Sequence, residues 1–149
     1  MKNQVCQAMG PDGEKYNCRN HDLSDFDTFR GGWRRVYICG PQGNGAERET
    51  EAALMCCRFA VSHQCVPVAP QLYYFRFLND FDYRERRLEM KFRLKDLKCC
   101  DEVWVFGERI SEGMEKELTF AARKGKHIRW FTNTEINEVM INREEDEDE

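Results

Sequence analysis

The chain has 149 residues, of which 41% are hydrophobic and 12% aromatic, so it is long enough and apolar enough to form a core. Its apolar runs are too short to cross a bilayer, and its first residues lack the apolar core of a signal peptide. Its net charge of −4 argues against general binding to polymeric nucleic acid. We therefore expect a cytoplasmic protein without a membrane partner.

Cysteine usage favours a reducing compartment as well. Eight cysteines are present, but Cys56-Cys57 and Cys99-Cys100 are adjacent pairs within helical patterns. Neighbouring cysteines bridge each other only with strain, whereas free cysteine packs as a small hydrophobic residue. These thiols are therefore expected to be reduced, as is typical of cytosolic proteins.

The first 33 residues are polar, rich in glycine and without a clear period, which predicts an N-terminal arm rather than a domain. Cys6, Cys18 and His21 suggest a zinc site. Their spacing, C-x11-C-x2-H, offers only three ligands and lacks a C-x2-C knuckle. A loosely packed arm is therefore favoured, and neither a metal nor a cofactor is expected.

From residue 34 onward, strand-like and helix-like segments alternate, which predicts an α/β domain over 34–142, followed by an acidic, solvated tail over 143–149. The fold class expected is a Rossmann-like or flavodoxin-like open parallel sheet of about four to five strands with helices on both faces. In chain order, the predicted strands cover 34–39, 66–69, 103–106 and 127–131, and the predicted helices cover 46–63, 83–99, a segment from Ser111 to Gly125, and 132–142.

Periodicity also predicts helix faces and helix ends. Ser111 is the expected N-cap of one helix, and Thr134 that of the last. The aromatic segment 70–82 is either a lid over a site or an apolar cover of the sheet edge. The residues predicted to face the core are Met114, Leu118 and Ala121 in the helix after Ser111, and Leu88, Phe92 and Cys99 in the helix over 83–99.

Two loops are expected to meet at the carboxyl edge of this sheet. The turn after the first strand, GPQGNG, is neither G-x-G-x-x-G nor a P-loop, so by itself it is a weak signal. In an open parallel sheet it can converge with the loop after the strand over 103–106. The crevice between them would contain Tyr37, Gly40, Pro41, Ser111, Gly113 and Glu117.

The same residues carry a resemblance. VYICGP at 36–41 and SEGMEKEL at 111–118 resemble the nucleoside 2-deoxyribosyltransferase superfamily, in particular the deoxyribosyltransferase-like domains of phages and bacteria. Catalytic members pair a Y-x-[CA]-G-[SP] strand end with a [DS]-x-G-x-x-x-E helix start. The spacing from Asp101 to Glu117 is similar to that in the branch that hydrolyses 2′-deoxynucleoside 5′-monophosphates. The resemblance covers about residues 35–131.

What the resemblance implies is glycosidic chemistry. Glu117 would attack the anomeric carbon of a (deoxy)nucleoside or its 5′-monophosphate, Tyr37 would hold the carboxylate, and water or a second base would resolve the intermediate. Family members are usually dimers or larger, so a homodimer or higher homo-oligomer is expected. The residues expected to contact the substrate are Gly40, Pro41, Gly43, Ser111, Gly113, Met114, Arg93 and Asp96.

Ser111 stands where nucleoside-specific members carry aspartate. A carboxylate there would repel a phosphate, whereas a hydroxyl and helix amides can bind one. Ser111 therefore favours a nucleotide over a free nucleoside as the ligand.

One position departs from the family pattern. Catalytic members carry an aspartate eight residues before the one that opens the strand over 103–106, and this chain has Arg93 there. Asp96 or Glu89, on the same helix face, can substitute, or Arg93 contacts a phosphate. Loss of a general acid costs ~10²–10⁴-fold in rate. A module that binds a nucleotide without turnover, and a structural or protein-interaction role, therefore stay open as alternatives.

Overall fold

The computed structural model describes residues 7–9, 11–17, 33–41 and 46–138, and the chain divides into two compact units, Met1–Gly32 and Trp33–Glu149. In the first unit, β1 (Gln7–Met9) and β2 (Lys15–Asn17) form an antiparallel pair. No strand is predicted here from the sequence, because three-residue strands are too short to show a period. Cys6, Cys18, His21 and the tail over 143–149 lie outside the described residues.

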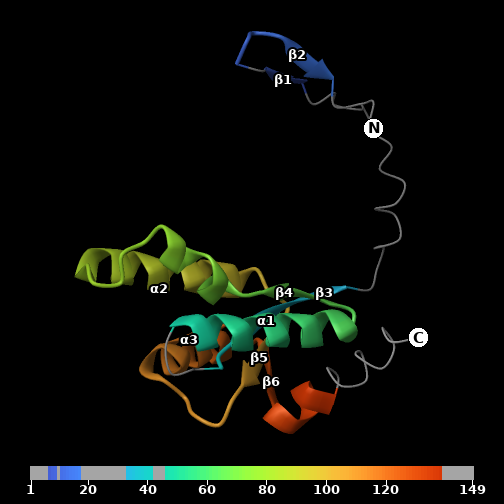
Figure 1. The fold of residues 1–149 in the computed structure, drawn as a ribbon, viewed down its shortest axis with the longest axis vertical. Coiled ribbons are helices and arrows are strands. Elements are labelled where there is room, and N and C mark those ends of the chain that lie inside the picture. The colour runs from blue at the N-terminus through green and yellow to red at the C-terminus, as the bar shows by residue number, and fades with distance from the viewer. Residues whose placement is uncertain (1–6, 10, 18–32, 42–45, 139–149) are drawn as a thin grey trace. The chain divides into compact units, whose positions relative to one another are not determined.

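The second unit contains a four-stranded, all-parallel sheet with the order β4-β3-β5-β6, so the predicted fold class is confirmed. The elements follow one another along the chain as the colours of Figure 1 show. Their bounds are β3 Arg34–Cys39, α1 Ala46–Ser62, β4 Cys65–Val68, the 3-10 helices η3 Pro70–Leu72 and η4 Tyr74–Arg76, α2 Tyr83–Lys98, β5 Glu102–Phe106, α3 Glu112–Arg123 and β6 His127–Phe131.

Alternation along the two central strands builds a core on each face of the sheet. Side chains of β3 and β5 point in turn to opposite faces, as strand geometry requires. On one face Val36, Ile38, Trp104 and Phe106 pack with Cys56, Phe59 and Ala60 of α1. On the other face Tyr37, Cys39, Val103 and Val105 pack with Leu97 of α2 and with Met114 and Ala121 of α3.

Two helix predictions are wrong. In α2 the buried residues are Glu89 and Leu97, whereas Leu88 is 42% exposed and Cys99 is also exposed. The helix turns a partly charged face inward because that face borders the candidate site described below.

The last helix begins at 133 rather than after Thr134. Thr132 caps it: its hydroxyl oxygen accepts from the Glu135 N–H at 3.4 Å, and the Glu135 carboxylate accepts from the Thr132 N–H at 2.7 Å. This reciprocal pair is a capping box, which ranks Thr132 above Thr134 as the N-cap.

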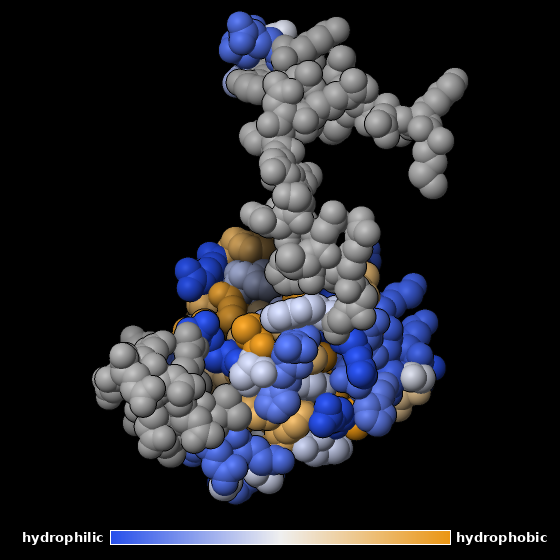
Figure 2. Space-filling model, turned by 90° about the vertical axis from the view of Figure 1, so that its right-hand side faces the viewer, coloured by the Kyte–Doolittle hydropathy of each residue, from blue (hydrophilic) through white to orange (hydrophobic). Residues whose placement is uncertain are grey.

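Among the described helices, none is both long and apolar enough to cross a bilayer. On the face that Figure 2 shows, hydrophilic side chains cover much of the described surface and smaller hydrophobic areas lie between them. The six described cysteines, Cys39, Cys56, Cys57, Cys65, Cys99 and Cys100, are free thiols.

Candidate active site

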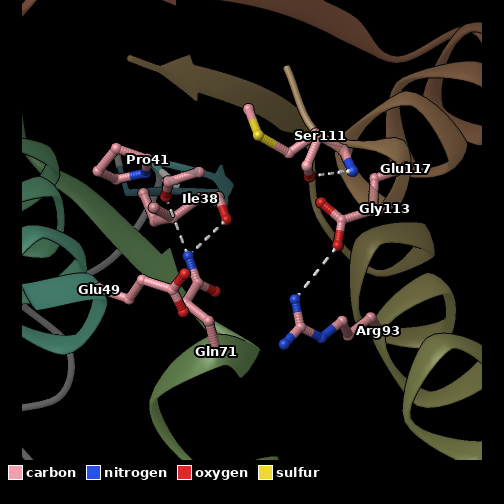
Figure 3. A pocket seen from close by; sticks show the side chains of 10 residues that line it. Ile38, Pro41, Glu49, Gln71, Arg93, Ser111, Gly113 and Glu117 are labelled. Atoms are coloured by element: carbon pink, nitrogen blue, oxygen red, sulfur yellow. Dashed lines mark hydrogen bonds and ion pairs between the residues drawn. The ribbon is translucent and has the colours of Figure 1, made fainter. Parts of the chain in front are cut away.

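A cavity of about 190 Å³ lies where β3 and β5 end, between the turn after β3 and the start of α3. This is the edge of a parallel sheet at which ligands bind in open α/β folds. Figure 3 shows Glu49 and Gln71 on one side of the cavity and Arg93 and Glu117 on the other. The residues lining it are Ile38, Gly40, Pro41, Glu49, Gln71, Arg93, Ser111, Gly113, Met114 and Glu117.

Glu117 is the buried carboxylate of this cavity, with 3% of its surface exposed. Its Oε1 accepts a hydrogen bond from the Tyr37 hydroxyl at 3.0 Å, and its Oε2 accepts one from the Cys39 thiol at 3.3 Å. Tyr37 and Cys39 stand two residues apart on β3, so both point to the face of the sheet on which α3 packs. The carboxylate is thereby held from two sides.

Burial sets the ionisation of this group. It raises the pKa of Glu117 above its ordinary value, although Arg93 and the hydrogen bonds from Cys39 and Tyr37 act in the opposite direction. Burial and the charge of Glu117 raise the pKa of Tyr37 well above its usual range. Tyr37 therefore stays protonated and remains a hydrogen-bond donor to Glu117.

Arg93 connects two carboxylates. Its Nη1 lies 3.6 Å from Glu117 Oε1, while its Nη2 and Nε donate to Glu89 Oε1 at 2.6 and 3.1 Å. Burial lowers the pKa of Arg93, but Tyr37, Glu117 and Glu89 raise it overall, so the guanidinium stays charged. Arg93 therefore occupies the cavity wall as a fixed cation beside the carboxylate.

Gly40 allows the turn after β3 to pass close to α3. Its φ is +78°, and a Cβ at this position would lie 2.6 Å from the Phe106 carbonyl oxygen and 2.8 Å from Met114 Cε. A side chain is excluded both by the backbone conformation and by the space. The peptide bond from Gly40 to Pro41 is cis.

The start of α3 forms another wall. Ser111 is its N-cap, as predicted, because its Oγ accepts from the Met114 N–H at 3.1 Å. Ser111 also lines the cavity, so the capping residue is exposed to a ligand. A Cβ on Gly113 would meet only Met90 Cε and Ser111 Oγ, each at 3.8 Å, so the fold itself leaves room for a side chain there.

The structure brings most of the predicted site residues together. Asp96 does not line the cavity, and its carboxylate instead accepts from the hydroxyls of Tyr73 and Tyr74 at 2.9 and 2.7 Å. Gly43 lies outside the described residues. Tyr37 does not line the cavity itself but donates a hydrogen bond to Glu117, which does. The predicted residues that line the cavity are Gly40, Pro41, Arg93, Ser111, Gly113, Met114 and Glu117.

Sequence reasoning missed Gln71, Glu49 and the Cys39 contact. Gln71 Nε2 donates to the carbonyl oxygens of Ile38 and Gly40 at 3.0 and 3.1 Å, and its buried Oε1 accepts no hydrogen bond from the residues that the structure describes. A buried acceptor in a cavity wall can accept a hydrogen bond from a ligand or from a water molecule. Glu49 follows the glycine-rich turn within the first turns of α1, which is the signal that points to it.

The family described as "Domain of unknown function (DUF7768)" matches residues 34–131. Among solved structures, the chain is similar to a 2-deoxyribosyltransferase from the psychrotolerant bacterium Bacillus psychrosaccharolyticus. The TM-score is 0.55 and the identity 15%, over 66% of this chain and 72% of that chain, a likeness that establishes the shared fold.

No curated protein sequence matches the chain. The family match spans the whole parallel sheet, from β3 to β6, and includes all the residues that line the cavity. On that ground, the chain belongs to the DUF7768 family.

Proposed function

We propose that the protein cleaves the N-glycosidic bond of a (deoxy)nucleoside 5′-monophosphate, or transfers its deoxyribosyl group, with Glu117 as the nucleophile. The observation that carries the proposal is the buried Glu117 carboxylate, held by Tyr37 and Cys39 on a cavity wall. Cleavage of the bond builds positive charge on the sugar, and an adjacent carboxylate stabilises that charge or adds covalently. The solved 2-deoxyribosyltransferase with the same fold supports this class of chemistry.

In the proposed reaction an oxygen of Glu117 attacks C1′ of the sugar. The C1′–N bond breaks, its electron pair goes to the leaving base, and the base takes a proton. The resulting glycosyl ester is then attacked at C1′ by water, or by the nitrogen of a second base, which releases the carboxylate of Glu117. A proton leaves the attacking water or base in this second step.

Glu49 is the side chain that we propose to protonate the leaving base. It lies across the cavity from Glu117, and its carboxyl is part of the lining. Two carboxyl groups on opposite sides of a substrate can divide the roles of nucleophile and acid. This assignment gives the chain a proton donor although Arg93 stands at the family's aspartate position.

A nucleotide suits the site better than a nucleoside. Ser111 adds no negative charge, and the N-terminus of α3 presents the partial positive charge of its free N–H groups. Arg93 adds a full positive charge on the same side of the cavity. We therefore expect the 5′-phosphate of the substrate to lie toward Ser111, Gly113 and Arg93.

A second candidate is a module that binds the same nucleotide without turnover. The ion pair of 3.6 Å between Arg93 and Glu117 favours it, because a cation next to the carboxylate lowers its nucleophilicity. Under this alternative Glu117 would be a ligand-binding group rather than a catalyst.

Release of free base distinguishes the two candidates. We would incubate the protein with deoxynucleoside and nucleoside 5′-monophosphates and separate the products by chromatography. Glu117→Gln is the test variant, and Glu115→Gln, an exposed position of the same helix, is the matched control. The first candidate requires release by the wild type and by Glu115→Gln but not by Glu117→Gln. Thermal stabilisation by a nucleotide without any release indicates the binding module.

Homodimerisation is part of the same proposal and is expected from the resemblance to the superfamily. Sedimentation of the full chain with and without a nucleotide tests it directly. A monomer in both conditions would contradict this part alone.

A further inference from the structure

A second concave surface adjoins the candidate active site, between the start of α2 and the start of α3. We call it the basic groove, and at about 920 Å³ it is larger than the cavity of about 190 Å³. Arg93 and Gly113 line both, so the two spaces meet at these residues. The residues lining the basic groove are Asp80, Tyr83, Arg86, Arg87, Glu89, Met90, Lys91, Arg93, Glu112, Gly113 and Lys116.

The charge of the basic groove is opposite to that of the chain. Five cationic and three acidic side chains line it, which gives +2 (5 − 3), whereas the whole chain carries −4. A cluster of cations on an acidic protein attracts anions to that surface. No ion pair joins Arg86, Arg87 or Lys91 to any other residue that the structure describes.

Two of the three acidic side chains of the basic groove form ion pairs with cations of the same groove. Glu112 lies 3.4 Å from Lys116, and Glu89 lies 2.6 Å from Arg93. Burial raises the pKa of Glu89, and the nearby charge of Asp80 acts in the same direction, whereas Arg93 opposes it. The groove cations without an ion-pair partner among the described residues are those of Arg86, Arg87 and Lys91, and the Arg87 guanidinium lies 5.7 Å from the centroid of the Tyr83 ring.

Because the cavity and the basic groove meet at Arg93 and Gly113, we infer that the basic groove binds a second phosphate group. The preferred ligand is then a nucleotide with a 5′-diphosphate linkage. The inference rests on the proposed function: a first phosphate beside Gly113 and Arg93 stands at the junction, and the next phosphate enters the groove. Arginine is suited to this role because its planar fork donates two parallel hydrogen bonds to phosphate oxygens. The shared chemistry is a pyrophosphate, whether free in a nucleoside diphosphate or substituted, as in a dinucleotide.

The test measures binding by calorimetry for three matched ligands: a nucleoside 5′-monophosphate, its 5′-diphosphate and the corresponding 5′-diphosphoribose. The test variant is Arg86→Gln combined with Arg87→Gln, both at exposed positions. The matched control is Arg84→Gln, because Arg84 is an exposed residue of the same helix that does not line the basic groove. Inorganic phosphate and pyrophosphate are titrated alongside as probes that do not need the nucleoside cavity.

We expect both diphosphate ligands to bind about tenfold or more tightly than the monophosphate. The double variant should lose this gain while it keeps its affinity for the monophosphate, and Arg84→Gln should keep both. Equal affinity for mono- and diphosphate, or an equal effect of Arg84→Gln, overturns the inference.

Failure of the proposed function has a different signature. In one outcome no nucleotide binds, pyrophosphate binds more tightly than phosphate, and the double variant loses this preference for pyrophosphate. The basic groove is then an anion site, and the proposed function is wrong. If the monophosphate releases its base through Glu117 but the diphosphate binds no better, the proposed function stands and the second phosphate site does not exist. A gain for the 5′-diphosphoribose alone would overturn the pyrophosphate as the recognised group.

Discussion

The guanidinium of Arg93 lies 3.6 Å from the carboxylate of Glu117 and also donates twice to the carboxylate of Glu89. One cationic side chain of α2 thus contacts two buried acids from two helices. The Glu117 carboxylate therefore does not lie in a purely apolar pocket, because a cation that also binds Glu89 lies beside it.

Replacement of Arg93 by methionine should therefore cost stability. It leaves Glu117 and Glu89 buried without their cation, and the loss of one partner from a buried pair typically costs about 3 kcal/mol or more. The change also removes the charge that lowers the pKa of Glu117, so any activity that needs the ionised carboxylate should appear at higher pH. Urea unfolding and a pH–rate profile measure the two effects. Arg93→Lys keeps a charge and should lose less, and an unchanged unfolding free energy in Arg93→Met would contradict this role of Arg93.

The raised pKa of Glu117 predicts how stability depends on pH. Below about pH 4.5 the carboxyl is protonated in the folded and the unfolded chain alike. Between that value and the raised pKa, the unfolded chain has lost the proton and the folded chain has kept it, so the unfolding free energy falls as pH rises. Glu117→Gln has no carboxyl group at this position, so its unfolding free energy lacks this pH dependence. Melting curves from ~pH 4 to ~pH 8 should show the wild type losing stability relative to the variant. Parallel curves would show that burial of Glu117 does not shift its ionisation.

Gly40→Ala should destabilise the fold. The added methyl group would need φ near +78° and would lie 2.6 Å from the Phe106 carbonyl oxygen, which is backbone and cannot move aside easily. We expect a loss of at least about 2 kcal/mol by chemical unfolding. Gly125→Ala is the control, because Gly125 has φ of +68° but nothing within 4 Å of the new methyl group. Equal losses in both variants would mean that only the backbone conformation matters.

Gly113→Ala should weaken nucleotide binding without a loss of stability. Gly113 lies in α3, and the new methyl group would make only ordinary contacts at 3.8 Å, so stability should hold or rise by up to about 1 kcal/mol. The same methyl group would narrow the junction of the cavity and the basic groove, so nucleotide binding should weaken about tenfold. Melting temperature and calorimetry report the two effects. Unchanged affinity would remove Gly113 from the binding surface.

Gln71→Met should change the selectivity of the site. Gln71 Oε1 in the cavity wall accepts no hydrogen bond from any described residue, and the bonds of Nε2 to Ile38 and Gly40 orient it. A ligand with a donor group facing it should bind the wild type more tightly than an analogue without the donor, by about tenfold. Paired nucleotides that differ by an exocyclic amino group test this preference. Gln71→Met should lose both the discrimination and about 1–2 kcal/mol of stability, and discrimination that survives the change would assign it to another group.

The sequence by itself determined the strands of the parallel sheet and the helices that follow them. Alternating apolar runs and helical periods follow from local backbone geometry, so β3, α3 and the Ser111 cap were predictable from their own residues. The Tyr37–Glu117 hydrogen bond was expected from the resemblance to a family, since 80 residues separate the two side chains.

Only the tertiary structure decided which face of α2 turns inward. Leu88 is exposed, whereas Glu89 is buried and Arg93 lines the cavity, where it pairs with Glu117 of α3. The tertiary structure also decided that Gln71 and Glu49 line the cavity and that Asp96 does not. Each depends on the distance between segments far apart in the chain, and local periodicity carries no information about such distances.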